Sequence, residues 1–182
     1  MAATFKNVQY LKDISGMAYM GDGTFVAVHD MKAHETKVWP RVSLLRIPKK
    51  LKTGLQWAPL NNGNVNWPTD RKIMDKDGIG PTAGPNDLES AARIPGTPYA
   101  LLCESTNSKE DTPIADRIYL AEADFDSNGG SITIRTYTSF STFTKANNVE
   151  ATAIAAITNG SYLFLWAERD EAKIHWRKMT LE

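Results

Sequence analysis

Three segments of the chain repeat one pattern, in which two apolar strands flank a tight turn. The segments are ISGMAYMGDGTFVAVHD (14–30), NDLESAARIPGTPYALLCES (86–105) and NVEATAIAAITNGSYLFLWAER (148–169). Each turn contains the glycine or asparagine that a chain reversal requires, and the flanking residues are rich in apolar and aromatic types. The pattern predicts three β-hairpins of one kind.

A third strand is predicted after each hairpin, at 41–47, 116–125 and 172–181. A fourth, more variable strand is expected before each hairpin, at 5–11, 54–60 and 131–140. We therefore predict an all-β, single-domain chain of three four-stranded antiparallel blades, with limits of about 5–50, 54–125 and 131–181. Repeated units of this kind are typical of a β-propeller. A β-sandwich is the alternative, and the repeat favours the propeller.

Three blades are fewer than the roughly four to eight of closed propellers. Unpaired strand edges and exposed apolar faces would remain at the two ends, and folded proteins avoid both. We therefore expect either a homodimer that completes a six-bladed propeller or missing blades in a longer native chain.

Acidic residues recur at the ends of these hairpins. Glu89 and Glu104 bracket the second hairpin, Glu150 and Glu168 bracket the third, and Asp30 closes the first at the position matched to Glu104 and Glu168. The start of the first strand and the end of the second share one edge of a hairpin. The acids of the three units are therefore expected to converge on one rim.

The longest connections leave the same edge, at 31–40, 61–86 and 106–115. Long loops at one face of a rigid scaffold usually carry binding sites. Arg41 and Arg117, at the starts of third strands, are assigned to this face. Trp39 and Trp67 lie in these loops, where an indole ring can stack on a ligand.

A rim of carboxylates has two chemical uses. It can bind a hard cation such as Ca²⁺, which takes roughly six to eight oxygen ligands. Crowded carboxylates also raise one another's pKa, so that one can serve as a general acid or base. The alternative is structural, with the acids in salt bridges to Arg41, Arg117 and Arg169, and both interpretations stay open.

The segments 14–30 and 86–105, together with PRVSLLRI (40–47), resemble the phytase-like, or esterase-like-phytase, β-propeller family. The shared pattern is a Ser-Gly-leading apolar strand, a strand ending in Asp, then Asp-Leu-Glu and a strand ending in Glu-Ser. The third hairpin, ending in LWAER, is similar to a further blade. The resemblance implies an acidic, often cation-binding central face and a phosphomonoester or ester hydrolase activity. It picks out six acids, which are Asp30, Asp87, Glu89, Glu104, Glu150 and Glu168.

Two functions are therefore expected as alternatives. In the first, the acids hold Ca²⁺, which activates water for hydrolysis of a small phosphoester or ester. Glu89 and Glu104 are then the catalytic candidates, and Arg41 or Arg117 binds the phosphate oxygens. In the second, the rim is a non-catalytic module that holds a ligand or a protein, and the cation is structural.

The composition limits the partners. The 21 acidic and 21 basic residues balance, which leaves no electrostatic footprint for nucleic acid or an anionic membrane. No signal-peptide core and no long apolar run appears, so the chain as given is expected to be soluble. The sequence does not predict its cellular compartment. The single cysteine, Cys103, is interpreted as a small buried side chain. His29 alternates with Asp30, which favours a packed or surface histidine over a general base.

Overall fold

The computed structural model describes residues 13–30, 41–47, 87–105, 117–126, 130–140, 148–169 and 172–181, and the backbone of 56–60 and 65–66. No helix in these ranges is long and apolar enough to span a membrane. They contain twelve strands: β1 (Ile14–Gly21), β2 (Thr24–His29), β3 (Val42–Arg46), β4 (Gln56–Leu60), β5 (Val65–Asn66), β6 (Leu88–Arg93), β7 (Tyr99–Glu104), β8 (Arg117–Asp124), β9 (Ser131–Ser139), β10 (Val149–Ala156), β11 (Ser161–Glu168) and β12 (Lys173–Thr180).

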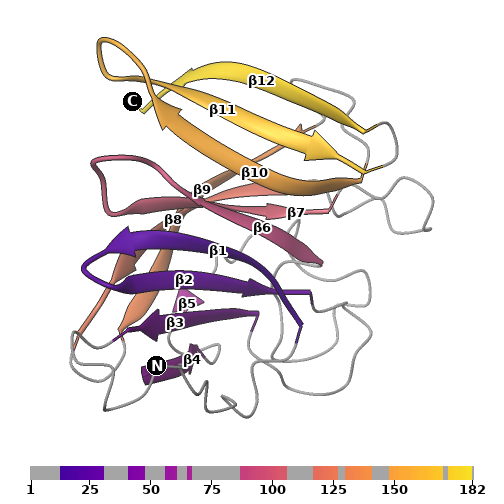
Figure 1. Ribbon diagram of the computed structural model, residues 1–182. Coiled ribbons are helices and arrows are strands. Elements are labelled where there is room, and N and C mark those ends of the chain that lie inside the picture. Colours follow the sequence, from indigo (N-terminus) through magenta and orange to yellow (C-terminus); the bar gives the residue numbers. More distant parts are fainter. Residues whose placement is uncertain are drawn as a thin grey trace, which may run out of the picture.

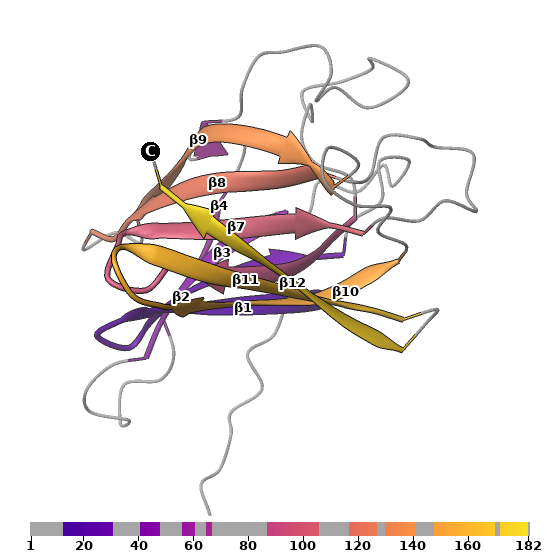
Figure 2. The ribbon, with the colours of Figure 1, turned by 90° about the horizontal axis from the view of Figure 1, so that it is seen from above.

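The strands form three sheets that lie one above another (Figure 1). Sheet A has the order β1-β2-β3-β4, sheet B the order β6-β7-β8-β9-β5, and sheet C the order β10-β11-β12. Neighbouring strands are antiparallel except for the short β5, which runs parallel to β9. The turns of the three predicted hairpins lie at one end of the stack (Figures 1 and 2). The all-β prediction and the three hairpins are confirmed.

Two of the variable strands belong to a different sheet from the one predicted. Strand β4 pairs with β3 and completes sheet A, and β9 pairs with β8 and extends sheet B. The predicted limits 54–125 and 131–181 therefore each start one strand too early. Sequential strands usually join the nearest open edge, and β3 and β8 present that edge, so the fourth strand follows its hairpin. The strand expected at 5–11 lies outside the described residues.

The first strand of each hairpin (β1, β6 or β10) is an edge strand of its sheet. These three edges meet, with β1 beside β6 and β6 beside β10, and we call this side of the stack the inner edge. Gly16 sits at the closest approach. A Cβ atom on Gly16 would lie 2.7 Å from Cα of Ser90 and 2.9 Å from the backbone nitrogen of Ala91. Only glycine therefore allows β1 to approach the β6 backbone this closely. Ser15 Oγ adds a hydrogen bond to the carbonyl of Leu88 across the same seam.

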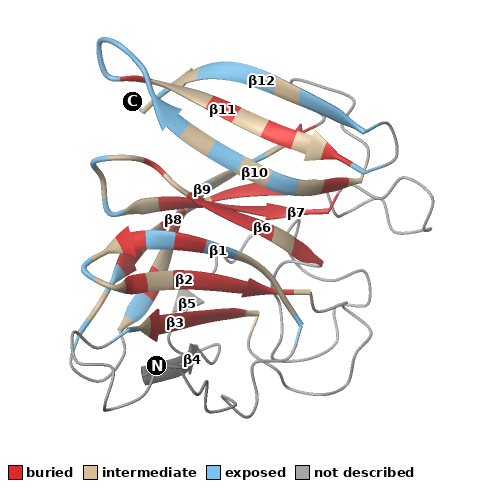
Figure 3. Cartoon of the chain, in the orientation of Figure 1, coloured by how far each residue is buried: buried red, intermediate tan, exposed pale blue. Residues whose placement is uncertain are grey.

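Two apolar layers fill the space between the sheets. Between sheets A and B, Val26 and Val28 pack in one cluster with Leu102 and Tyr119. Between sheets B and C, the opposite face of sheet B packs against Phe164 of sheet C. Figure 3 shows the buried residues concentrated in sheets A and B, whereas much of sheet C is exposed. Sheet B is therefore the central layer, with both faces covered.

Three backbone features recur in every hairpin and allow its positions to be equated. The residue before the first strand has a left-handed backbone, with φ of 54°, 57° and 54° at Asp13, Asp87 and Asn148. Two residues later a β-bulge inserts one extra residue, which is Ser15, Glu89 or Glu150. The amide after the second strand then donates to the carbonyl of the left-handed residue, from Asp30, Ser105 and Arg169. The three hairpins are thus one structural unit, used three times.

The close approach at Gly16 leads to a stability prediction. Gly16→Ala is expected to lower the free energy of unfolding by roughly 1–3 kcal/mol, because the new methyl group would push against the β6 backbone. Urea unfolding followed by circular dichroism measures this. Ser131→Ala, at an exposed position of β9, is the control and should leave the midpoint unchanged. Equal midpoints for the two variants would show that the seam has room for a side chain.

Candidate functional site

Three of the six predicted acids come together at the inner edge, between sheets A and B. Asp30 follows β2, Asp87 precedes β6, and Glu89 is the bulged residue of β6. One carboxylate oxygen from each lies within 4.8 Å of the others. Asp87 is 8% exposed, and the other two are half-buried. The bulge matters because an extra residue re-aims its side chain and lets Glu89 depart from strict strand alternation.

The donor set of this acidic cluster (Asp30, Asp87 and Glu89) is chemically uniform. All three side chains offer carboxylate oxygen, the donor that Ca²⁺ and Mg²⁺ prefer. Oδ1 of Asp30 is buried and accepts no hydrogen bond from the described residues. Ionised carboxylates this close repel one another, and a cation between them would remove that repulsion. The cluster therefore fits a hard divalent cation.

The junction between sheets B and C provides an internal comparison. The residues equivalent to the acidic cluster are there Ser105, Asn148 and Glu150. Ser105 Oγ lies 3.3 Å from Asn148 Oδ1, so a neutral hydrogen bond takes the place of two carboxylates. Glu150 is ion-paired with Arg169, whose Nη2 lies 2.6 Å from Glu150 Oε2. The backbone of the repeat therefore does not itself require three acids, and their convergence belongs to the A/B junction.

Glu104 has a different environment from the acidic cluster. Its side chain is 0% exposed and accepts hydrogen bonds from the Arg117 guanidinium at 2.8 Å (Nε to Oε2) and 2.6 Å (Nη2 to Oε1). The backbone nitrogen of Arg117 and the hydroxyl of Tyr119 donate two more bonds, each of 3.0 Å. This bidentate pair matches the structural alternative for Glu104, and it also engages Arg117, a predicted phosphate ligand.

Tyr119 closes the group formed with Glu104 and Arg117. Burial raises the pKa of Tyr119 far above its ordinary value, and the adjacent Glu104 carboxylate raises it further, against the opposing charges of Arg117 and Arg41. The phenol therefore stays protonated and remains a donor to Glu104. Arg41 lies near enough for its charge to act on Tyr119, and its carbonyl accepts a 3.0 Å hydrogen bond from the His29 amide.

Glu168 is also enclosed by neighbours in sheet C. It is 5% exposed, and its Oε1 lies 3.4 Å from the Trp166 indole nitrogen, which donates to it. His175 Nε2 lies 3.4 Å from the same oxygen, within ion-pair distance. The His175 ring stacks on Trp166 with centroids 5.3 Å apart. The structure thus places Glu104 and Glu168 in separate interior layers, away from the Glu150–Arg169 pair at the surface.

The repeat corrects one match made from sequence. Glu104 and Glu168 pair across the hairpin with Leu88 and Val149, and the residue that pairs with Ile14 in this way is His29, not Asp30. The sequence match was one residue off because it aligned the terminal acids, whereas the cross-strand register aligns His29 with Glu104 and Glu168. His29 is 3% exposed and lies 2.7 Å from Ser43 Oγ, so its interpretation as a packed histidine is confirmed.

Sequence reasoning missed the partners of these buried groups. Each lies on the third strand of its sheet, opposite the same hairpin position, and together they give the pairs His29–Ser43, Glu104–Tyr119 and Glu168–His175. The three partners share one register position of the third strand, but β8 and β12 carry other polar residues, so the sequence alone did not single this position out. Trp39, Trp67 and the long loops at 31–40, 61–86 and 106–115 lie outside the described residues, except for the backbone of β5 (Val65–Asn66).

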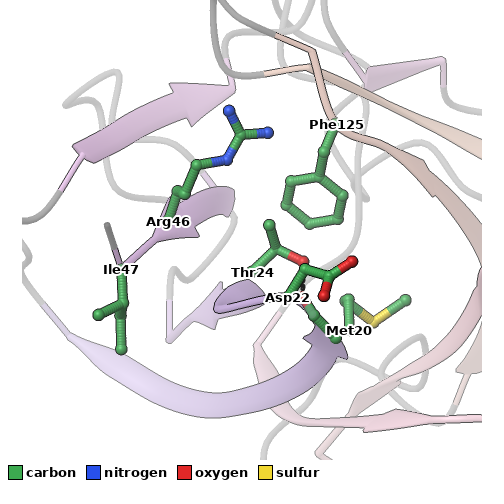
Figure 4. A pocket seen from close by; sticks show the side chains of 7 residues that line it. Met20, Asp22, Thr24, Arg46, Ile47 and Phe125 are labelled. Carbon is green, nitrogen blue, oxygen red and sulfur yellow. Dashed lines mark hydrogen bonds between the residues drawn. The ribbon is translucent and has the colours of Figure 1, made fainter. Parts of the chain in front are cut away.

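A separate hollow of about 490 Å³ lies at the other end of sheet A, beside the β1–β2 turn. Its lining includes the side chains of Met20, Asp22, Thr24, Arg46 and Phe125 (Figure 4). None of the acids predicted from sequence lines this hollow. It is therefore distinct from the acidic cluster.

Cys103 gives a prediction about reactivity. Burial raises the pKa of its thiol from 9.0 to about 12, so the reactive thiolate is scarce at neutral pH in the folded chain. A thiol reagent is expected to leave native protein unmodified at pH 8 and to label it stoichiometrically after unfolding in urea. Mass spectrometry of the two samples measures this, and rapid labelling of the native protein would contradict the buried placement.

The two kinds of ion pair lead to a matched prediction. Glu104→Gln keeps the shape but leaves the Arg117 charge buried and poorly compensated, so we expect a loss of about 3 kcal/mol in the free energy of unfolding. Glu150→Gln breaks a pair whose arginine is 67% exposed, and the expected loss is below about 1 kcal/mol. Denaturant unfolding of both variants tests the difference. Equal losses would contradict the structural role of Glu104.

Comparison with known proteins returned no match: neither a protein-family model nor a curated protein sequence matches the chain.

Proposed function

We propose that the chain binds a divalent cation, Ca²⁺, at Asp30, Asp87 and Glu89, and that it acts as a ligand- or protein-binding module built around this site. The observation that carries the proposal is the convergence of three carboxylate oxygens within 4.8 Å from two different sheets. The buried Oδ1 of Asp30, which accepts no hydrogen bond from the described residues, supports it.

The cation would connect sheet A to sheet B. Asp30 comes from the end of β2, whereas Asp87 and Glu89 come from the start of β6. Three carboxylates supply between about three and six oxygen ligands, and backbone carbonyls or water would complete a Ca²⁺ shell. A cation held in this way stabilises the folded chain, because the unfolded chain does not bring these three acids together.

We further propose that sheets A, B and C are blades of a β-propeller, as the resemblance to the phytase-like family implies. Two observations support this. The innermost strands β1, β6 and β10 follow one another side by side, and each hairpin repeats the same left-handed residue, bulge and closing hydrogen bond. In such an arrangement the acidic cluster lies at one end of the central channel.

A second candidate function is hydrolysis of a phosphoester or ester by the bound cation. Asp30 and Glu89 are only half-buried, so a metal there would keep coordination positions for water and substrate. Arg41 starts its strand beside this end, with its carbonyl bonded to the amide of His29. Because Glu104 engages Arg117, the catalytic version of the proposal relies on Glu89 and Arg41.

Thermal melting tests the cation site. After EDTA treatment, millimolar Ca²⁺ is expected to raise the melting temperature, and a concentration 100-fold above Kd corresponds to about 2.7 kcal/mol of stabilisation. Asp30→Asn should reduce this shift markedly, because it removes a negative charge while keeping the shape and one oxygen. Glu150→Gln, at the equivalent of Glu89 in sheet C, is the matched control and should keep it. A wild-type chain whose melting is indifferent to Ca²⁺, Mg²⁺ and Mn²⁺ would end the proposal.

Turnover separates the two candidate functions. A binding module shows stabilisation by the cation and no hydrolysis of p-nitrophenyl phosphate or p-nitrophenyl acetate. A hydrolase shows cation-dependent turnover that is lost in both Asp30→Asn and Arg41→Ala. Stabilisation that persists in Arg41→Ala while turnover disappears would assign Arg41 to the substrate and not to the fold.

A further inference from the structure

The outer face of sheet C is apolar and uncovered. Its register aligns the rows Ala151–Ala167–Ile174 and Ala153–Leu165–Trp176 across β10, β11 and β12. Ile174 is 73% exposed and Trp176 is 68% exposed. Figure 3 shows exposed positions along both β10 and β12. Contiguous apolar surface of this kind usually marks a contact with another protein surface.

The repeat identifies what this face does in the other two sheets. One cross-strand pair occupies the same position in each hairpin, and the three pairs are Ala18–Val26, Ala92–Leu101 and Ala153–Leu165. In sheet A the pair is buried against sheet B, and in sheet B Leu101 packs in the layer shared with sheet C. Ala153 in sheet C is exposed. The uncovered face is therefore the one that each preceding sheet uses to pack on the next.

Sheet A has an uncovered face on its opposite side, where no preceding sheet packs among the described residues. In sheet B, Ala91 belongs to the face that receives sheet A, and it is 7% exposed. The equivalent residue in sheet A is Met17, which is 55% exposed, and Tyr19 on the same strand is 54% exposed. Ala27 on β2 is already buried, so the uncovered part of this face is the row along β1.

Charge supports the same pairing. The position that holds Asp30 at the A/B junction holds Arg169 at the end of sheet C, and the position of Asp87 corresponds to Asp13 before β1. Arg169 is 67% exposed along its side chain, and Asp13 is exposed. If sheet C packed on sheet A of another chain as sheet A packs on sheet B, Arg169 would meet Asp13. Opposite charges would thus face each other at that junction.

We propose that the outer face of sheet C docks on the β1 side of sheet A in a second copy of this chain, with β10 of one copy beside β1 of the other. The contact continues the β1/β6 and β6/β10 packing that the fold already contains. Two copies would contribute six sheets, within the roughly four to eight of closed propellers, whereas three copies would exceed that range. The closed assembly is therefore a dimer with two identical contacts.

Light scattering coupled to gel filtration tests the dimer at micromolar concentration. The wild-type chain is expected at twice the 20.2 kDa of one copy. Ala153→Arg places a charge on the face of sheet C, and Met17→Arg places one on the receiving row, so each variant alone is expected to run as a monomer. An equimolar mixture should recover the dimer mass, because one of its two contacts then joins two unmodified faces. Thr158→Arg, on the exposed β10–β11 turn, should stay dimeric.

Other outcomes overturn the proposal. A monomeric wild-type chain, or masses above two copies, would exclude the closed dimer. Dissociation by Ala153→Arg alone, with Met17→Arg still dimeric, would mean that sheet C of one copy packs on sheet C of the other. Circular dichroism of each variant confirms that the hairpins are folded. The contact needs no cation at Asp30, so the mass measured in EDTA separates its failure from failure of the cation site.

Discussion

The β-bulge near the start of each first strand is the constraint on which the rest of the structure depends. It adds one residue after the left-handed position, and it thereby shifts the alternation of everything that follows in the strand. At this bulged position Glu89 joins Asp30 and Asp87 at the A/B junction. Glu104, on the strand without the bulge, is buried and ion-paired with Arg117.

Glu104 and the acidic cluster differ in how their carboxylates are surrounded. Glu104 receives four hydrogen bonds, two from a guanidinium, so its charge is compensated within the protein. The acidic cluster gathers carboxylates from two sheets, with one oxygen of each within 4.8 Å of the others. The first arrangement joins β7 to β8 within sheet B without any ligand. The second lies between sheets A and B and fits the divalent cation that we propose it binds.

The sequence predicted the hairpins well, because apolar strands and turn residues act locally. It also placed Asp30 and Glu89 at one edge, since the ends of paired strands must share it, whereas Asp87 was implied only by the resemblance. The other three acids that it expected on this rim lie elsewhere in ion pairs. It failed where the information is not local. The cross-strand register that makes His29, and not the acid after it, the counterpart of Glu104 is not marked by any residue type. Likewise, nothing in residues 54–60 distinguishes pairing with the preceding strand from pairing with the following one, so β4 was placed in the wrong unit.

The three repeats share a backbone but differ in charge where their sheets meet. Three acids lie at the A/B junction, a neutral Ser105–Asn148 hydrogen bond lies at the B/C junction, and Arg169 and Asp13 occupy the two uncovered ends. Identical junctions would let any sheet pack on any other, because the apolar layers alone are unselective. The position of Asp30 is taken by Ser105 in sheet B and by Arg169 in sheet C, so each junction differs in charge. In the dimer that we propose, Arg169 would face Asp13, and this opposite charge would distinguish the contact between copies from the A/B junction, where three acids meet.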